Sequence, residues 1–117
     1  MSPATLQNRC FDEINAGDTA SVTRTLTQRD VQLFAAVSGD VNPTHLDPEL
    51  ARQLGTGELR AHSMWLGAQV SGVLGNQLPG PGTIYAGQDL DFLGPVAIGD
   101  QVTISVTARS KDPATRQ

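Results

Sequence analysis

The stretch HSMWLGAQVSGVLGNQ, residues 62–77, is the longest helix candidate in this chain. Large apolar residues recur along it at helical spacing, namely Leu66, Val70, Val73 and Leu74. A neighbouring stripe holds only small residues: Gly67, Ser71 and Gly75, with Ala68 and Gly72 beside them. Each glycine inside a helix costs up to about 1 kcal/mol relative to alanine. The pattern predicts a helix that a curved sheet or a second subunit approaches closely; a poorly formed helix with only a packing face is the alternative.

Segments of alternating polarity lie on both sides of this helix in the sequence. They are residues 19–26 before it and residues 83–92 and 101–109 after it, and each predicts a strand. Turn residues at Gly94-Pro95 and Gly99-Asp100 separate the last two segments, so we expect those to form an antiparallel pair. The order of strand, helices, long helix and strands predicts an α+β fold in which an antiparallel sheet wraps around one central helix.

Two shorter helices are expected between the first strand and the central helix. Thr27 is a suitable N-cap for a helix that runs to about Val37, and Gly39 can end it in a left-handed conformation. Residues 40–46 are expected to form a loop. Asp47-Pro48 then predicts the start of a second helix that Gly55 ends, and residues 55–57 suggest a hinge-like linker.

Size and composition predict one globular domain over residues 1–117. A chain of 117 residues, 38% hydrophobic and 17% charged, suits a single core. A net charge of −4 without a Lys/Arg cluster argues against nucleic acid or an anionic membrane as partner. Cys10 is the only cysteine, so neither a disulfide framework nor a thiolate metal cluster is expected. Residues 1–8 carry no apolar signal region and no apolar run is long enough to span a bilayer, which predicts a cytoplasmic protein.

The two histidines, His45 and His62, lie beside the residues most suited to chemistry. Asp40 and His45 are five residues apart in a loop that contains Pro43. A loop after a capped helix can turn both side chains toward one point, where they could share a water molecule. In the alternative interpretation, Asp40 and Asn42 are turn residues and His45 is a partly buried packing residue.

Other arrangements of reactive side chains are weaker. Asp40, His45 and Asp47 could act as metal ligands, but a third imidazole or thiolate beside them is missing, so no metal is expected. Ser63 adjoins His62 without a Gly-x-Ser-x-Gly motif, which argues against a serine nucleophile. Residues 80–82 precede a strand rather than a helix and therefore do not form a nucleotide loop.

The stretch FAAVSGDVNPTHLD, residues 34–47, resembles the hydratase motif of the MaoC-like (R)-specific enoyl-CoA hydratases. Residues 61–64 resemble the start of that family's central helix, usually His-Gly-Met, and residues 78–85, 88–92 and 95–100 follow its later signature. Met64-Trp65 is closest to hydratase domains fused ahead of a phosphate acetyl- or butyryltransferase, so the full-length protein could contain such a transferase domain.

The resemblance implies a hot-dog fold and a lyase activity in fatty acid metabolism. The expected reaction is hydration of a trans-2-enoyl thioester of coenzyme A to the (R)-3-hydroxyacyl thioester. Asp40 and His45 would activate the water, and the backbone N–H of Ser63 would bind the enolate oxygen. His62 and Asn42 are further expected contacts of the oxyanion, substrate or water. The coenzyme A thioester is the substrate, no separate cofactor is expected, and the resemblance implies a homodimer.

The chain departs from this family at two points. Ser63 stands where the family has glycine, and only three strands are predicted where the family's hot dog has five. The second departure suggests that C-terminal strands are missing from this chain. Two other functions stay open at this stage: an acyl-CoA thioesterase, and a non-catalytic hot-dog module for dimerisation or acyl-CoA binding.

Overall fold

A computed structural model describes residues 8–55 and 57–117 of the chain. These residues form two compact units. Within the described residues, the first, here called the site unit, comprises residues 23–55, 57–67 and 90–102; the second unit comprises residues 8–22, 68–89 and 103–117. The linker expected at residues 55–57 includes Thr56, which lies outside the described residues, as do Met1 to Gln7 of the N-terminal segment.

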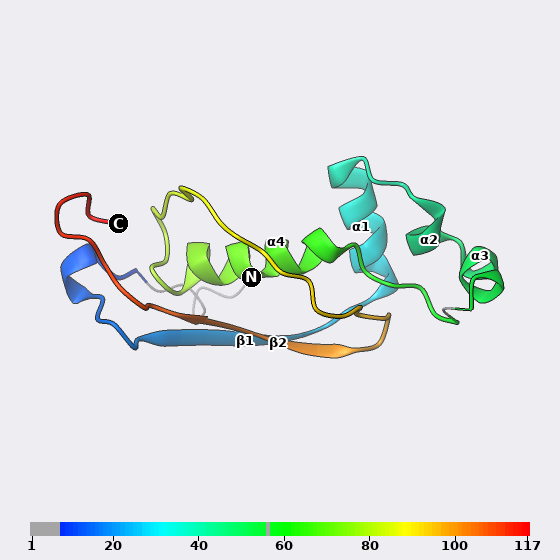
Figure 1. The fold of residues 1–117 in the computed structure, drawn as a ribbon, viewed down its shortest axis with the longest axis horizontal. Coiled ribbons are helices and arrows are strands. Elements are labelled where there is room, and N and C mark those ends of the chain that lie inside the picture. Colours follow the sequence, from blue (N-terminus) through cyan, green and yellow to red (C-terminus); the bar gives the residue numbers. More distant parts are fainter. Residues whose placement is uncertain (1–7, 56) are drawn as a thin grey trace. The chain divides into compact units, whose positions relative to one another are not determined.

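The elements follow the predicted α+β order (Figure 1). They are the 3-10 helix η2 (Phe11–Glu13), β1 (Thr19–Thr25), α1 (Gln28–Ser38), α2 (Pro43–Leu46), α3 (Pro48–Gln53), α4 (Ser63–Asn76) and β2 (Gln101–Thr107). The first strand, the central helix α4 and the helices α1 and α3 are therefore confirmed to within a residue or two.

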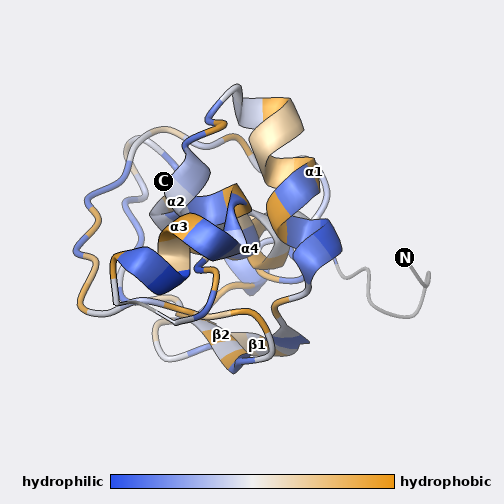
Figure 2. Cartoon of the chain, turned by 90° about the vertical axis from the view of Figure 1, so that its right-hand side faces the viewer, coloured by the Kyte–Doolittle hydropathy of each residue, from blue (hydrophilic) through white to orange (hydrophobic). Residues whose placement is uncertain are grey.

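Helix α1 begins and ends where its capping residues predict. Thr27 Oγ1 accepts a hydrogen bond from the N–H of Asp30 at 3.1 Å, and Asp30 Oδ2 accepts one from the N–H of Thr27 at 2.9 Å. This capping box satisfies two N–H groups that the first turn leaves free. Gly39 has φ 75° and donates its N–H to the carbonyl of Ala35. Figure 2 shows both hydrophobic and hydrophilic residues on α1, and the buried ones are Val31 and Ala35.

The expected loop at residues 40–46 is wrong in its second half, because Pro43–Leu46 forms the one-turn helix α2. Asn42 caps it by accepting the N–H of Thr44, and Pro43 occupies its first turn, where no N–H is needed. Asp47-Pro48 starts α3 in the same way. The Asn42-Pro43 pair was thus the local signal for α2.

The core of the site unit is built around Leu26, Val31 and Trp65. Partly buried hydrophobic residues pack against it: Phe34, Leu46, Ala61, Leu66, Val96, Ile98 and Val102. A short antiparallel pairing holds the segment before α4, because Ala61 donates to the carbonyl of Val96 and Ile98 donates to that of Leu59. This pairing fixes the backbone that leads into the first turn of α4.

The predicted pairing of residues 83–92 with 101–109 is wrong. Strand β2 instead pairs with β1 in a two-stranded antiparallel sheet (Figure 1). Beside the strands, the N–H of Gly17 donates to the carbonyl of Ala108 and the N–H of Leu26 donates to the carbonyl of Asp100. The pairing therefore continues past both ends of β2. Residues 83–92 form no strand in the described part of the chain. Alternation shows which residues share a face but does not say which strand is the neighbour. Among the described residues the structure has two strands, where three were predicted.

In the second unit, the later turns of α4 carry the small-residue stripe. Val73 of α4 is buried, as are Leu78 and Ile104. A Cβ added to Gly72 or Gly75 would meet nothing within 4 Å. In the site unit, a Cβ on Gly67 would lie 3.2 Å from Cε of Met64 and 3.7 Å from Cδ1 of Leu90. Met64 belongs to α4 itself and Leu90 lies in ordinary van der Waals contact, so the approach of a sheet or a second subunit to this stripe stays a prediction.

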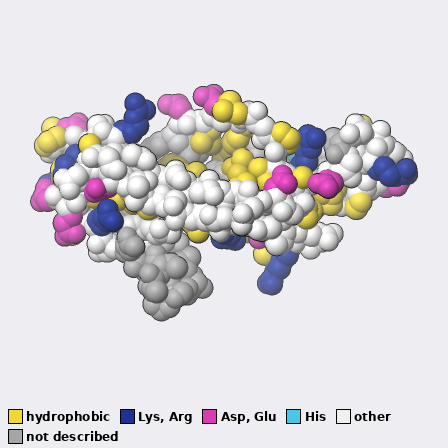
Figure 3. All heavy atoms as spheres, turned by 90° about the horizontal axis from the view of Figure 1, so that it is seen from below, with side chains coloured by type: hydrophobic (Ala, Val, Ile, Leu, Met, Phe, Trp, Pro, Cys, Tyr) yellow, Lys and Arg dark blue, Asp and Glu magenta, His cyan; other side chains and the backbone are white. Residues whose placement is uncertain are grey.

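In the part of the chain that the structure describes, no helix combines the length and hydropathy needed to cross a membrane. Figure 3 shows acidic and basic side chains scattered over the face in view, with hydrophobic side chains between them. That distribution agrees with the absence of a basic cluster in the sequence.

Candidate active site

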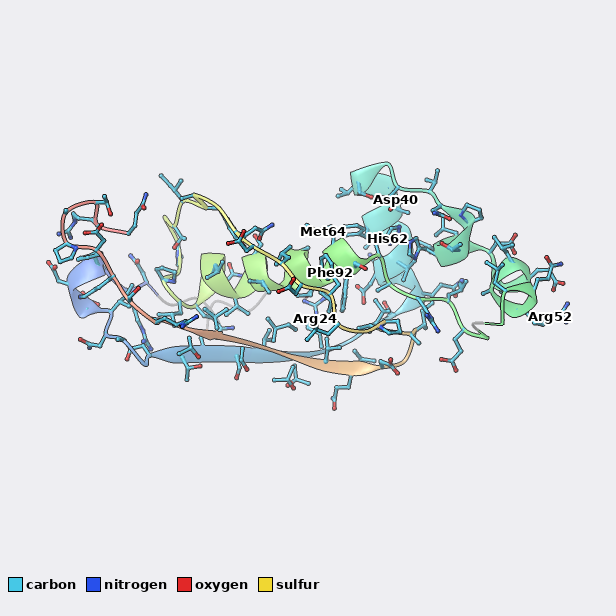
Figure 4. All side chains as sticks on the ribbon, in the orientation of Figure 1. Arg24, Asp40, Arg52, His62, Met64 and Phe92 are labelled. Carbon is cyan, nitrogen blue, oxygen red and sulfur yellow. The ribbon has the colours of Figure 1, made fainter. Side chains whose placement is uncertain are left out.

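Three of the predicted site residues come together in the site unit. One side-chain ligand atom each of Asp40, His45 and His62 lies within 4.8 Å of the other two. Figure 4 labels Asp40, just beyond α1, and His62, just before α4. A single water molecule can bridge polar groups at such a separation. The geometry therefore allows Asp40 and His45 to hold one water between them.

The Asp40 loop is shaped by hydrogen bonds within itself. Asp40 donates its N–H to Oγ of Ser38 at 3.1 Å, and its Oδ1 accepts the N–H of Asn42 at 3.2 Å. Asn42 Oδ1 in turn accepts from the N–H and the hydroxyl of Thr44 at 3.0 and 2.9 Å. The amide oxygen of Asn42 is thus used to cap α2, which brings His45 into position on that helix.

The imidazole of His45 is oriented by a backbone carbonyl. Its Nδ1 lies 2.9 Å from the carbonyl oxygen of Arg60. A carbonyl oxygen can only accept, so Nδ1 carries the proton and, in the neutral ring, Nε2 keeps its lone pair. A His whose Nδ1–H is held in this way is prepared to act as a base through Nε2.

His62 is the buried member of the group, with 3% of its surface exposed. Its Nε2 lies 2.8 Å from the carbonyl oxygen of Asp40 and therefore donates to it. Its ring stacks on that of His45 with centroids 4.1 Å apart, and it meets the ring of Phe34 at 4.9 Å. Its Nδ1 is buried and has no hydrogen-bond partner among the described residues.

Ser63 is the first residue of α4 and adjoins His62. The first N–H groups of a helix have no acceptor within that helix, and the helix dipole favours an anion beside them. The place of Ser63 at the start of α4 suits the expected oxyanion role of its N–H, which stays a prediction. Its side chain is exposed.

The three side chains do not have the geometry of a metal site. The rings of His45 and His62 are stacked with centroids 4.1 Å apart and planes that differ by only 27°, so no point close to both rings lies in both ring planes, where the lone pairs point. A metal ion about 2.0–2.1 Å from a nitrogen of each ring would need those lone pairs to converge. Asp47, the other ligand considered, uses its carboxylate to cap α3 through the N–H groups of Glu49 and Leu50.

The sequence did not reveal the partners that hold these side chains. They are the carbonyl of Arg60, the ring of Phe34 and the carbonyl of Asp40 itself. Every residue has a carbonyl, so residue identity contains no signal for such a contact. The pairing of residues 59–61 with 96–98 was equally absent from the pattern.

Known proteins match this chain over nearly its whole length. Residues 12–117 match the family described as MaoC like domain. The chain belongs to the MaoC-like domain family. Among curated proteins, this MaoC-like chain is 41% identical to an (R)-specific enoyl-CoA hydratase of Rhodospirillum rubrum, over 97% of the chain and 78% of that protein.

Two solved structures show the fold of this MaoC-like chain. An R-hydratase from Pseudomonas aeruginosa, in the unliganded form, is 44% identical with a TM-score of 0.89, over 92% of this chain and 70% of that one. An (R)-hydratase from Aeromonas caviae is 40% identical with a TM-score of 0.82, over 86% of this chain and 76% of that one. The predicted hot-dog fold is thereby confirmed.

Proposed function

We propose that this MaoC-like chain hydrates trans-2-enoyl thioesters of coenzyme A to (R)-3-hydroxyacyl thioesters and catalyses the reverse dehydration. The observation that carries the proposal is the convergence of Asp40 and His45, with the His45 ring held so that Nε2 keeps its lone pair. The similarity to proteins named as (R)-specific hydratases supports the same reaction.

In the proposed mechanism, Asp40 and His45 both hydrogen-bond the attacking water. One of them accepts a proton as the water oxygen forms a bond to the β-carbon of the enoyl group. The double-bond electrons move toward the thioester and give an enolate. The α-carbon then takes a proton from the pair, so that one water is added across the double bond and the pair returns to its starting state.

The negative charge of the enolate needs a donor. The N–H of Ser63, at the start of α4, would donate a hydrogen bond to the enolate oxygen, and the helix dipole would favour the negative charge there. One such oxyanion donor is typically worth about 3 kcal/mol of the barrier. The enoyl thioester and one water supply every reacting atom, and Asp40 and His45 would move the proton, so we propose that the reaction uses no metal or other cofactor.

The test is the loss of enoyl absorbance when the protein is added to crotonyl-CoA, followed by chiral analysis of the product. The proposal predicts (R)-3-hydroxybutyryl-CoA. Incubation with saturated butyryl-CoA is the matched control, because a thioesterase releases free thiol from it and a hydratase does not. Failure to consume crotonyl-CoA, or an (S) product, would contradict the proposal.

Replacement of Ser63 by glycine is expected to raise the turnover on crotonyl-CoA. The backbone N–H is retained in the variant, while the Cβ and hydroxyl that crowd the thioester are removed. Positioning errors of about 1 Å can cost roughly 100-fold, so a several-fold gain is expected. The measurement is steady-state turnover of Ser63→Gly beside the wild type, with Ser63→Ala as the control that removes only the hydroxyl. A fall in turnover in Ser63→Gly would make the serine side chain a participant.

We further propose that the chain acts as one hot-dog domain within a homodimer. The segment at residues 83–93 supports this, because Ile84 is 89% exposed and Leu93 is 96% exposed in the single chain. Large apolar side chains exposed in this way favour a protein partner. Light scattering at micromolar concentration is expected to give twice the mass of one chain, and the mass of a single chain would contradict the proposal.

A cytoplasmic location and a transferase domain elsewhere in the full-length protein complete the proposal. The first is supported by the absence of a membrane-spanning helix among the described residues, and the second by Met64-Trp65 at the start of α4. Cell fractionation tests the location. The mass of the protein in its native cells tests the fusion, because an added transferase domain makes it far heavier than this chain.

A further inference from the structure

We propose that His62 is a positioning residue, which holds Asp40 and His45 in the geometry that hydration needs. This inference rests on the proposed hydratase function and assigns His62 a role other than direct contact with the substrate. It starts from two contacts of one ring: the hydrogen bond to the carbonyl of Asp40 and the stack on His45.

The first step concerns what ties the loop to the rest of the site unit. The hydrogen bonds among Ser38, Asp40 and Asn42 join residues only two apart, so they shape the loop internally. By contrast, the bond from His62 to Asp40 spans 22 residues, and the bond from His45 to Arg60 spans 15. Both long-range bonds end in the segment at residues 60–62, which the pairing with residues 96–98 fixes.

The second step concerns the rigidity of the His62 ring. His62 is buried, with 3% of the residue exposed, and its ring contacts the rings of Phe34 and His45. A side chain enclosed in this way has little rotamer freedom. The ring can therefore fix the Asp40 backbone and the His45 imidazole relative to the start of α4.

The third step concerns the cost of having an imidazole at this place. Nδ1 of His62 is a buried acceptor without a partner among the described residues. A buried acceptor without a partner destabilises the fold, because it loses its hydrogen bond to water and gains none in return. A phenylalanine would fill similar space without this penalty. The donor at Nε2, which bonds the Asp40 carbonyl, is the feature that an aromatic hydrocarbon lacks, and this points to the hydrogen bond as the function of the residue.

The test compares variants that separate the donor from the ring. His62→Phe keeps the ring and loses the donor. His62→Gln places an amide N–H near the position of Nε2, whereas His62→Asn is too short to reach it. Phe34→Leu is the control, because it loosens the packing against His62 and leaves the hydrogen bond intact.

We expect His62→Phe to lower kcat on crotonyl-CoA by about 10- to 100-fold, with KM changed by less than about twofold, because misplaced groups slow chemistry without weakening binding. His62→Gln is expected to keep kcat within about fivefold of wild type. Phe34→Leu is expected to lose clearly less than His62→Phe, about two- to fivefold, because it loosens the His62 ring but keeps the donor. The amide resonances of Val41 and Asn42 should shift more in the NMR spectrum of His62→Phe than in that of Phe34→Leu.

Several results would overturn the inference. They are a kcat above half of wild type in His62→Phe, a KM that rises as much as kcat falls, or an equal loss in Phe34→Leu. If His62→Phe does not fold, the comparison of His62→Asn with His62→Gln decides. A low kcat in His62→Asn together with a kcat near wild type in His62→Gln supports the inference, and equal kcat values in the two variants overturn it. A wild type without hydratase activity overturns the proposed function instead, and unmoved Val41 and Asn42 resonances then reject the positioning role independently.

Discussion

Asp40→Asn and His45→Ala are each expected to lower the turnover on crotonyl-CoA by at least about 100-fold, which is the usual contribution of a general acid or base. Asn keeps the shape of the aspartate but cannot accept a proton, and Ala removes the imidazole that the Arg60 carbonyl orients. Because the two groups are proposed to act on one water, the double variant is expected to be little slower than the slower single variant. Steady-state kinetics and a circular dichroism spectrum of each variant provide the measurement.

The matched control for the aspartate is Asp91→Asn, at an exposed position of the same unit. It removes one carboxylate, as Asp40→Asn does, and is expected to leave turnover within about twofold of wild type, as surface substitutions usually do. If Asp40→Asn or His45→Ala kept more than a tenth of the wild-type turnover, the assignment of the pair would be abandoned. Equal losses in Asp40→Asn and Asp91→Asn would show that net charge, rather than the pair, matters.

Trp65→Ala is expected to reduce the free energy of unfolding by about 3–5 kcal/mol, the range found when a buried aromatic residue is truncated. Trp65 is 4% exposed and packs with Leu26 and Val31 at the centre of the site unit. Its removal leaves a cavity that these neighbours only partly fill. A loss of this size is a large part of the stability of a typical domain.

Urea denaturation followed by circular dichroism is the measurement, because Trp65 is the only tryptophan and its fluorescence disappears with it. Protein concentration is held constant, since a dimer's stability depends on it. Trp65→Phe is the control: it keeps an aromatic ring and should lose clearly less stability than the alanine variant. A loss below about 1 kcal/mol in Trp65→Ala would show that Trp65 is not at the centre of this core.

The helices of the site unit were predictable because their signals are local. Thr27 and Asp30 cap α1 through bonds between residues three apart, and Gly39 ends it at φ 75°. Asp47 and Pro48 start α3 in the same way. Interactions of this range depend on side-chain chemistry within one turn, so residue identity determines them. The pair Asn42-Pro43 contained the same information for α2.

Strand pairing was the part of the fold that alternation could not determine. Residues 101–109 alternate as β2 requires, yet their neighbour is β1, more than 70 residues earlier in the chain, and not the segment at 83–92. A strand with two free edges can pair with any extended segment that the rest of the fold brings beside it. The choice depends on loop lengths and packing, which no short pattern contains.

The same division applies to the site. The sequence by itself determined which groups are present: a carboxylate and an imidazole five residues apart, and a second histidine at the start of a helix. Only the tertiary structure decided that the second histidine, His62, would reach back 22 residues to the carbonyl of Asp40 and stack on His45. The physical reason is that its partners are a backbone carbonyl and a ring face. Every residue offers the first and many offer the second, so only the folded chain selects among them.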